Sequence, residues 1–158
     1  MKLSDFDMFC FQRAITLAQT AEAEGNLPVG AVISLDQQII GEGKSKIWAP
    51  KISLDSHAEM EAMRSVPPEV WQQAPSMVLY STLEPCLMCL GSILLHRIGH
   101  VYFGSSDPYG GAGCVENHLP PFFAAQCSKL VWMGPALPEM CDPLFDRLSV
   151  MEKRKKFY

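Results

Sequence analysis

Two short motifs, HAE at 57–59 and PCLMC at 85–89, constrain this chain more than any other feature. Cys86 and Cys89 are three residues apart, which places them on one face of a helix, and their sulfurs suit either a redox pair or a soft metal ion. The histidine and glutamate of the first motif have no role in a dithiol redox site. An imidazole beside two thiols is instead a ligand set typical of zinc. The motifs therefore predict that two separate segments meet around one metal ion.

The local chemistry of each motif supports this prediction and leaves one alternative open. Pro85 suits the first turn of a helix, where its missing N–H is not needed, and a helix N-terminus favours thiolates. A strand followed by Cys-x-x-Cys is also typical of thioredoxin-like redox proteins. Residues two apart on a regular helix face different directions. For His57 and Glu59 to share one site, we expect His57 to lie where the backbone is only entering its helix.

The number of zinc ligands separates a structural site from a catalytic one. Structural sites are usually closed by four protein ligands, whereas catalytic sites keep the fourth position open. Four further residues are candidates for closing the site: His96, His100, Cys114 and His118. In an open site zinc lowers the pKa of its bound water, and Glu59 would take that water's proton. Such chemistry suits hydrolytic deamination, in which hydroxide adds to an amidine carbon and ammonia leaves.

Length and composition predict one domain that spans residues 1–158, because 158 residues with 48% apolar side chains can build a proper core. The N-terminus carries acidic residues where a signal peptide would be basic. The longest nearly apolar stretch, at 86–95, is about half of the ~20 residues that a membrane span needs. We therefore expect a cytoplasmic protein without a membrane segment. Six cysteines in such a chain favour thiols or metal ligands over disulfides.

Hydrophobic periodicity predicts an alternation of strands and helices along the chain. The first helix, 5–24, begins with a capping-box pattern at Ser4 and Asp7. Further segments follow: helices at 57–66, 86–98 and 142–156, and strands at 29–35, 39–43, 77–83, 100–104 and 128–133. This order predicts the α/β class, as a three-layer α/β/α sandwich with a mixed five-stranded sheet. The first two strands should form an antiparallel hairpin, and the later strands should join through helical crossovers.

With these motifs the chain resembles the cytidine/deoxycytidylate deaminase superfamily, whose signature is H-x-E followed by P-C-x-x-C. The stretches LPVGAVI (27–33), LYSTLEPCLMCLGSI (79–93) and VYFGSSDPYGGAG (101–113) are most similar to bacterial tRNA wobble-adenosine deaminases. Guanine and cytosine deaminases are close relatives that share the zinc motif and less of the last stretch. The resemblance implies a cytidine-deaminase-like fold, one Zn²⁺ per chain and a homodimer whose interface lies near the active sites.

The resemblance also implies roles for individual residues. His57, Cys86 and Cys89 would bind zinc, and Glu59 would shuttle protons. The backbone N–H of Cys86 would stabilise the tetrahedral oxygen of the reaction. Four residues would contact the substrate: Val29, Ser45, Ala58 (through its N–H) and Glu84 (through its carbonyl, which would accept from the leaving amine). The family normally has asparagine at the position of Ser45, and a serine has one hydroxyl where asparagine has an amide.

The charges leave the substrate open between RNA and a free base. A tRNA enzyme needs phosphate contacts, and four cations at the end of the last helix are candidates: Lys153, Arg154, Lys155 and Lys156. They would equally complement the helix dipole and keep the terminus in solution. The net charge of −4 and Ser45 weigh against RNA, and the motif context weighs for it. We predict conversion of adenosine to inosine in tRNA, with deamination of a free base or nucleoside, such as guanine or cytosine, as the alternative. A catalytically silent nucleic-acid-binding module is disfavoured by Glu59.

Overall fold

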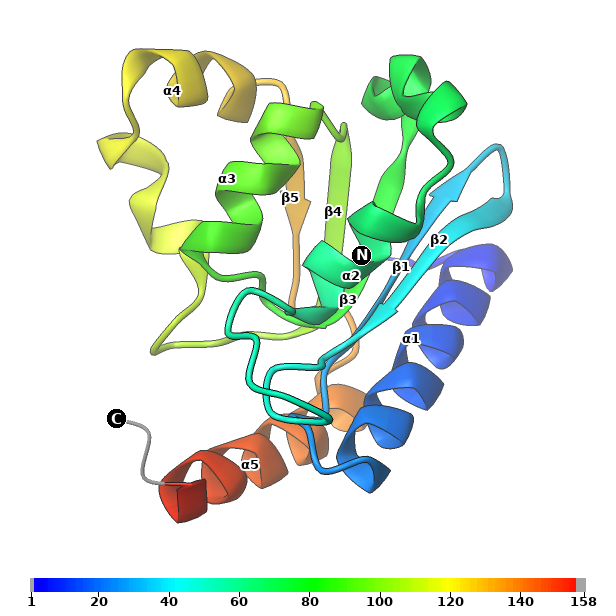
Figure 1. Ribbon diagram of the computed structural model, residues 1–158. Coiled ribbons are helices and arrows are strands. Elements are labelled where there is room, and N and C mark those ends of the chain that lie inside the picture. The colour runs from blue at the N-terminus through cyan, green and yellow to red at the C-terminus, as the bar shows by residue number, and fades with distance from the viewer. Residues whose placement is uncertain (1, 156–158) are drawn as a thin grey trace.

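The computed structural model describes residues 2–155, with only the backbone at 116–117 and 152–155. Its centre is a sheet of five strands (Figure 1). These are β1 (Gly30–Leu35), β2 (Gln38–Lys44), β3 (Val78–Leu83), β4 (His100–Ser105) and β5 (Val131–Met133). Their order is β2-β1-β3-β4-β5, with β1 antiparallel to both β2 and β3, and with β3, β4 and β5 parallel. The predicted hairpin, the mixed sheet and the helical crossovers are confirmed.

Helices cover both faces of this sheet, as the predicted three-layer sandwich requires (Figure 1). One face carries α1 (Asp5–Ala23) and the start of α5 (Pro138–Lys155), and the other carries α2 (Ala58–Ser65) and α3 (Leu87–His96). A further helix, α4 (Pro121–Cys127), packs beside α3. Every helix within the described residues falls short of the length or the apolar character that a membrane crossing demands.

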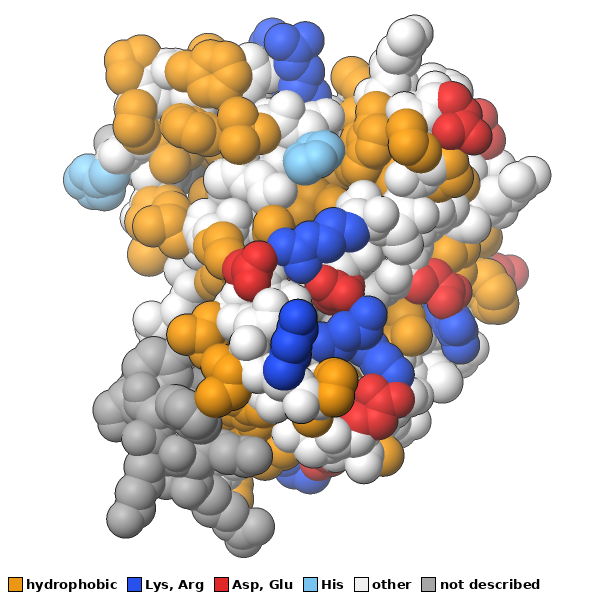
Figure 2. Space-filling view, viewed as in Figure 1, with side chains coloured by type: hydrophobic (Ala, Val, Ile, Leu, Met, Phe, Trp, Pro, Cys, Tyr) orange, Lys and Arg blue, Asp and Glu red, His pale blue; other side chains and the backbone are white. Residues whose placement is uncertain are grey.

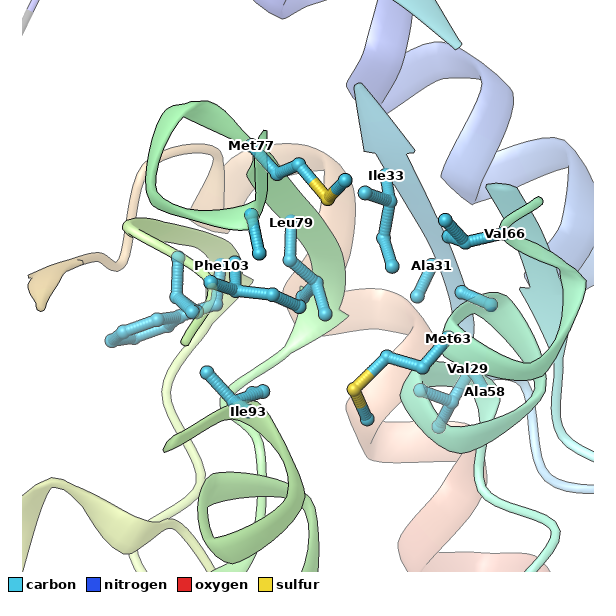
Figure 3. Close-up of a cluster of buried hydrophobic side chains, with 14 of the residues drawn as sticks. Val29, Ala31, Ile33, Ala58, Met63, Val66, Met77, Leu79, Ile93 and Phe103 are labelled. Carbon is cyan, nitrogen blue, oxygen red and sulfur yellow. The ribbon is translucent and has the colours of Figure 1, made fainter. Parts of the chain in front are cut away.

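The alternation of side chains along the strands divides the core in two, because successive residues of a strand point to opposite faces. In β3, Leu79 faces α2 and α3, whereas Tyr80 faces α1. In β4, Val101 and Phe103 take the first direction and Tyr102 the second. Figure 3 shows the cluster on the α2 and α3 side, where the apolar side chains of the sheet meet those of both helices. This packing fixes the two helices that carry the HAE and PCLMC motifs.

The sequence predicted the ends of some helices and strands correctly, but it misplaced others and missed three short helices. The capping box at the start of α1 is present, with Ser4 and Asp7 each bonding the other's backbone N–H. The last helix begins at Pro138, earlier than the expected 142, and β5 is shorter than the expected 128–133. Three short helices lie in segments for which no element was predicted: α4 and two 3-10 helices, η1 (Pro68–Ser76) and η2 (Ala112–His118). Their brevity and their proline and glycine content hide any helical periodicity.

Candidate metal centre and active site

The two motifs meet because the N-termini of α2 and α3 converge in front of the sheet. His57 is the N-cap of α2, with an extended backbone (φ −68°, ψ 155°), so it lies just outside the helix that contains Glu59. Cys86 is the N-cap of α3 (φ −75°, ψ 175°), and Cys89 lies in the first turn. The expected position of His57 at the entry to its helix is confirmed. Pro85, expected in the first turn, precedes the N-cap instead, because the helix begins only at Leu87.

Three donor atoms form a nearly equilateral triangle. The Nδ1 atom of His57 lies 3.6 Å from the Sγ atom of Cys86 and 3.7 Å from that of Cys89, and the two sulfurs are 3.7 Å apart. A tetrahedral zinc with Zn–S bonds of about 2.3 Å and a Zn–N bond of about 2.0 Å places two sulfurs about 3.8 Å apart and sulfur and nitrogen about 3.5 Å apart. The chemistry and the spacing of these donors therefore both fit one zinc ion.

Within the described side chains, none of the four candidates for a closed site joins this triangle. Among the side chains that the structure describes, His57, Cys86 and Cys89 are the one group of three or more His, Cys, Asp or Glu residues close enough to hold a metal ion. The candidates for a closed site lie elsewhere: His96 hydrogen-bonds the Ser92 carbonyl and stacks near Trp71, His100 lies in β4, and Cys114 and His118 are exposed. The geometry therefore favours an open centre with three protein ligands.

Glu59 lies beside the triangle and is 3% exposed. Its Oε1 atom accepts a hydrogen bond of 3.0 Å from the Ser81 hydroxyl, and its Oε2 atom lies 3.5 Å from the Cys89 sulfur. Burial raises the pKa of the Glu59 carboxyl above its ordinary value. A buried carboxyl that holds a proton more readily than usual, next to a metal centre, suits a group that takes and returns protons.

The pKa values of the two cysteine thiols are shifted in opposite directions. The hydrogen bond between the two sulfurs lowers the pKa of the Cys86 thiol to about 4, and His57 contributes in the same direction. The same hydrogen bond and burial raise the pKa of Cys89. These shifts favour the thiolate form at Cys86, which is the form in which a cysteine binds a metal. A dithiol redox site would use neither the imidazole nor the buried carboxylate.

A cavity of about 630 Å³ opens over the triangle. All four residues that were expected to contact a substrate line it: Val29, Ser45, Ala58 and Glu84. Other lining residues carry no signal in either motif, among them Asp107 and Tyr109 of the glycine-rich loop and three residues of α5: Phe145, Leu148 and Ser149. A loop of serine, aspartate and glycine at a strand end could have indicated the first two, because such loops often carry binding residues.

The carboxylate of Glu84 lines the cavity and also hydrogen-bonds the loop that contains Asp107 and Tyr109. Its two oxygens accept hydrogen bonds from the backbone N–H groups of Asp107 (3.1 Å) and Gly113 (3.0 Å). A Cβ atom at Gly111 would lie 2.5 Å from the carboxylate carbon, so the loop can wrap this closely only with glycine there. Glu84 thus holds in place the segment that forms one wall of the cavity.

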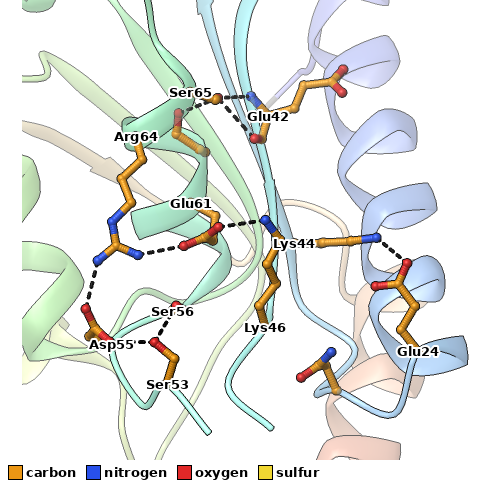
Figure 4. A network of polar contacts seen from close by, with 12 residues as sticks. Glu24, Glu42, Lys44, Lys46, Ser53, Asp55, Ser56, Glu61, Arg64 and Ser65 are labelled. Carbon is orange, nitrogen blue, oxygen red and sulfur yellow. Dashed lines mark hydrogen bonds and ion pairs between the residues drawn. The ribbon is translucent and has the colours of Figure 1, made fainter. Parts of the chain in front are cut away.

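The basic residues near the site are largely paired with acids. Lys46 contacts Glu61 at 2.8 Å, and Lys44 contacts Glu24 (Figure 4). Figure 2 shows Lys and Arg side chains intermingled with Asp and Glu on this face, rather than gathered alone. At the end of α5 only the backbone of Lys153, Arg154 and Lys155 is described, and Lys156 lies outside the described residues. Their expected contact with nucleic acid therefore stays a prediction.

Comparisons with known proteins agree with the site. The family model for the cytidine and deoxycytidylate deaminase zinc-binding region matches residues 4–105. The tRNA-specific adenosine deaminase of Haemophilus influenzae is 42% identical over 114 residues, which are 69% of this chain and 64%, just under two thirds, of that protein. The tRNA-specific adenosine deaminase of Agrobacterium fabrum is 35% identical over 144 residues, 89% of this chain and 91% of that protein. A solved structure from a study of A-to-I editing by tRNA:A34 deaminases at the wobble position has a TM-score of 0.64 and 30% identity, and the match covers 72% of this chain and 90% of that one.

Proposed function

The chain belongs to the cytidine and deoxycytidylate deaminase family of zinc-binding proteins, and we propose that it is a hydrolytic deaminase that converts adenosine to inosine in tRNA. The resemblance that the HAE and PCLMC motifs indicated is thereby confirmed. The observation that carries the proposal is the open donor triangle with the buried carboxylate of Glu59 beside it, at the floor of a cavity. Zinc held by such a set supplies Lewis-acid activation of water near neutral pH.

Glu59 would move the protons of the reaction. Its carboxylate takes a proton from the water that attacks the carbon bearing the amine and delivers it to the neighbouring ring nitrogen. It then takes the second proton from the added hydroxyl and gives it to the amine, so the bond from carbon to nitrogen breaks, ammonia leaves and the oxygen becomes the carbonyl. Water and amine are thus exchanged for carbonyl and ammonia, and the carboxylate returns to its starting state. Its burial supports this role, because the proton is held away from bulk solvent.

Backbone groups at the two helix N-termini would hold the reacting base. The N–H groups of Cys86 and Ala58 belong to helix starts, where such groups lack a partner within the helix. The first would stabilise the tetrahedral oxygen and the second would bind an acceptor of the base. The Glu84 carbonyl would accept from the leaving amine, while Val29 and Ser45 would contact the base or its sugar from the opposite wall.

The charge of the cavity supports a neutral base inside it and phosphates outside it. The described lining includes three carboxylates, those of Glu59, Glu84 and Asp107, and no lysine or arginine. A phosphate inside the cavity would meet these carboxylates and no lysine or arginine of the described lining, so we expect a free nucleotide to be a poor substrate. In RNA the flanking phosphates would lie outside the cavity, and Lys51 is exposed in the segment that follows the lining residues Ser45 and Ile47. The named activity of the two relatives, tRNA-specific adenosine deamination, supports this choice over a free base.

We further propose a homodimer in the cytoplasm, with pairing close to the active sites. Large apolar side chains are exposed directly beside the metal-ligand segments: Leu54 before His57, and Leu87 and Met88 after Cys86. Apolar side chains also gather over α3 and α4 in Figure 2. Sedimentation of the protein should therefore give the mass of two chains, and a Leu87→Glu substitution should shift it toward one.

The decisive experiment is an ammonia-release assay on matched substrates. We expect release from a tRNA anticodon stem-loop with adenosine at the wobble position, and little from free adenosine, guanine or cytosine. Affinity for the stem-loop should fall steeply with salt, because phosphate contacts release counterions. Glu59→Ala is the control: it should keep one zinc per chain and lose ammonia release. Release from guanine or cytosine alone, without salt dependence, would replace the tRNA proposal with the free-base alternative.

A further inference from the structure

A serine hydroxyl lies on the apolar face of β3 and contacts the catalytic carboxylate. Ser81 is fully buried, and its neighbours across the sheet are Ala31 and Phe103, both part of the apolar cluster below α2 and α3. A hydroxyl in such surroundings is unfavourable unless it finds a partner. Its partner is the Oε1 atom of Glu59, at 3.0 Å. Ser81 lies outside both the HAE and the PCLMC motif.

The two oxygens of Glu59 have different neighbours, and this difference sets the direction of the carboxylate. Oε1 is held by Ser81 from the sheet side, whereas Oε2 lies 3.5 Å from the Cys89 sulfur, at the donor triangle. The last torsion of a glutamate is broad, so an unanchored carboxylate would sample many orientations. The Cys89 sulfur and the backbone N–H of Glu59 also contact this carboxylate, but Ser81 is the partner that holds Oε1 on the sheet side and leaves Oε2 turned toward the donor triangle.

We propose that Ser81 is a positioning residue for the deamination: its hydroxyl fixes Oε1 of Glu59 so that Oε2 stays directed at the place where protons are exchanged. This inference rests on the proposed function, because it assigns Ser81 a role in the proton transfers made by Glu59. A hydrogen bond to a charged partner is stronger than one between neutral groups. Its loss should lower kcat by roughly tenfold. The KM should change little, because the hydroxyl does not line the cavity.

A purely structural role predicts a different result. If Ser81 served only to satisfy a buried hydroxyl, Ser81→Ala would change the unfolding temperature and leave kcat of the folded protein unchanged. Ser34→Ala is the matched control for that case. Ser34 is a buried serine in the adjacent strand β1, on the α1 side of the sheet, where its hydroxyl bonds Tyr80 instead of Glu59. Ser34→Ala should lower the unfolding temperature and leave kcat unchanged.

The experiment compares wild type, Ser81→Ala, Ser81→Thr, Ser81→Val and Ser34→Ala, each with its zinc content measured. Thr and Val have nearly the same shape, so their difference reports the hydroxyl even where the added methyl groups disturb folding. We expect one zinc per chain in all five proteins, a kcat about tenfold lower for Ala than for wild type, and a similar deficit for Val relative to Thr. In a Glu59→Ala background, Ser81→Ala should have no further effect on residual turnover.

A binding measurement tests the same contact without turnover. A stem-loop that carries purine riboside at the wobble position lacks the amine, so it can take up water but releases no ammonia. Its affinity should fall about tenfold in Ser81→Ala, in parallel with kcat. Equal kcat and equal affinity in wild type and Ser81→Ala, with turnover in both, would overturn the role of Ser81 alone. A wild type that releases ammonia from none of the substrates would overturn the proposed function, and the role of Ser81 with it.

Discussion

Gly43→Ala should weaken zinc binding by displacing α2, the helix that follows His57 and contains Glu59. Gly43 lies in β2 directly beneath α2, and a Cβ atom there would fall well inside 3 Å of the Ala58 carbonyl oxygen and the Ala62 nitrogen, and 2.9 Å from the Ala62 Cα. These atoms are helix backbone and cannot rotate away. Because heavy-atom contacts settle beyond about 3 Å, α2 would have to move from the sheet by roughly 1 Å.

The displacement would be transmitted to the site because α2 carries two of its groups. His57 caps this helix and Glu59 lies in its first turn. Metal–ligand distances tolerate only about 0.2 Å, so a shift of roughly 1 Å would open the donor triangle. Misplacement of a catalytic group by such an amount can lower turnover by about a hundredfold. The overpacking itself should lower the free energy of unfolding by about 1–3 kcal/mol.

The assay measures zinc per chain, kcat and urea unfolding for Gly43→Ala and for a control glycine at which a Cβ atom would also clash with backbone. Gly99→Ala is that control, since a Cβ there would press on the Pro75 carbonyl at the end of the sheet remote from the cavity. We expect both variants to lose stability, and only Gly43→Ala to lose zinc affinity and turnover. A Gly43→Ala protein with full zinc and wild-type kcat would refute the reasoning. Equal loss of zinc in both variants would refute it as well.

Two further perturbations test the fold and the metal. Asp7 accepts hydrogen bonds from Ser4 and from the Tyr80 hydroxyl; burial opposes ionisation, yet these bonds hold the pKa of its carboxyl below 3.8. Its contribution is therefore fully present above the unfolded-state pKa near 3.8 and is lost as pH falls through the lower folded-state value. Asp7→Ala should lower the free energy of unfolding by about 1 kcal/mol at pH 7, and urea titrations should show this difference shrinking as pH falls below 3.8 through the folded-state pKa; a difference independent of pH would contradict this. Removal of zinc with a chelator should cost about 3 kcal/mol, or roughly 6–12 °C in unfolding midpoint, whereas Cys89→Ala should not respond to the chelator. If the unfolding midpoint of the wild type is the same with and without the chelator, no metal is bound at this site.

The parts of the fold that sequence could predict are those set by local chemistry. Ser4 and Asp7 need only each other to begin α1, and the strand alternation needs only its neighbours. The entry of His57 into α2 followed from a local constraint too, because two groups two residues apart share a site only at a helix end.

The parts that escaped prediction depend on contacts between distant segments. In the sequence, Ser81 is one polar residue within a predicted strand. It contacts Glu59 only because α2 packs over β3. Phe145 and Leu148 reach the cavity because α5 returns beneath the sheet. No spacing within the PCLMC or HAE motif encodes either relation, since each depends on how separate elements dock.

The pairing of charged side chains also depends on contacts between distant segments, and it affects which lysines could contact RNA. Lys44 ends β2 and Lys46 follows in the loop before His57, yet in the fold Lys44 pairs with Glu24 at the end of α1 and Lys46 pairs with Glu61 of α2. A lysine already paired gains less from a phosphate, because it must give up one anion to bind another. Exposed Lys51, rather than these two, is therefore the residue of this loop whose replacement by alanine should reduce the salt dependence of stem-loop binding. An equal reduction for Lys46→Ala would mean that the pair with Glu61 opens when RNA binds.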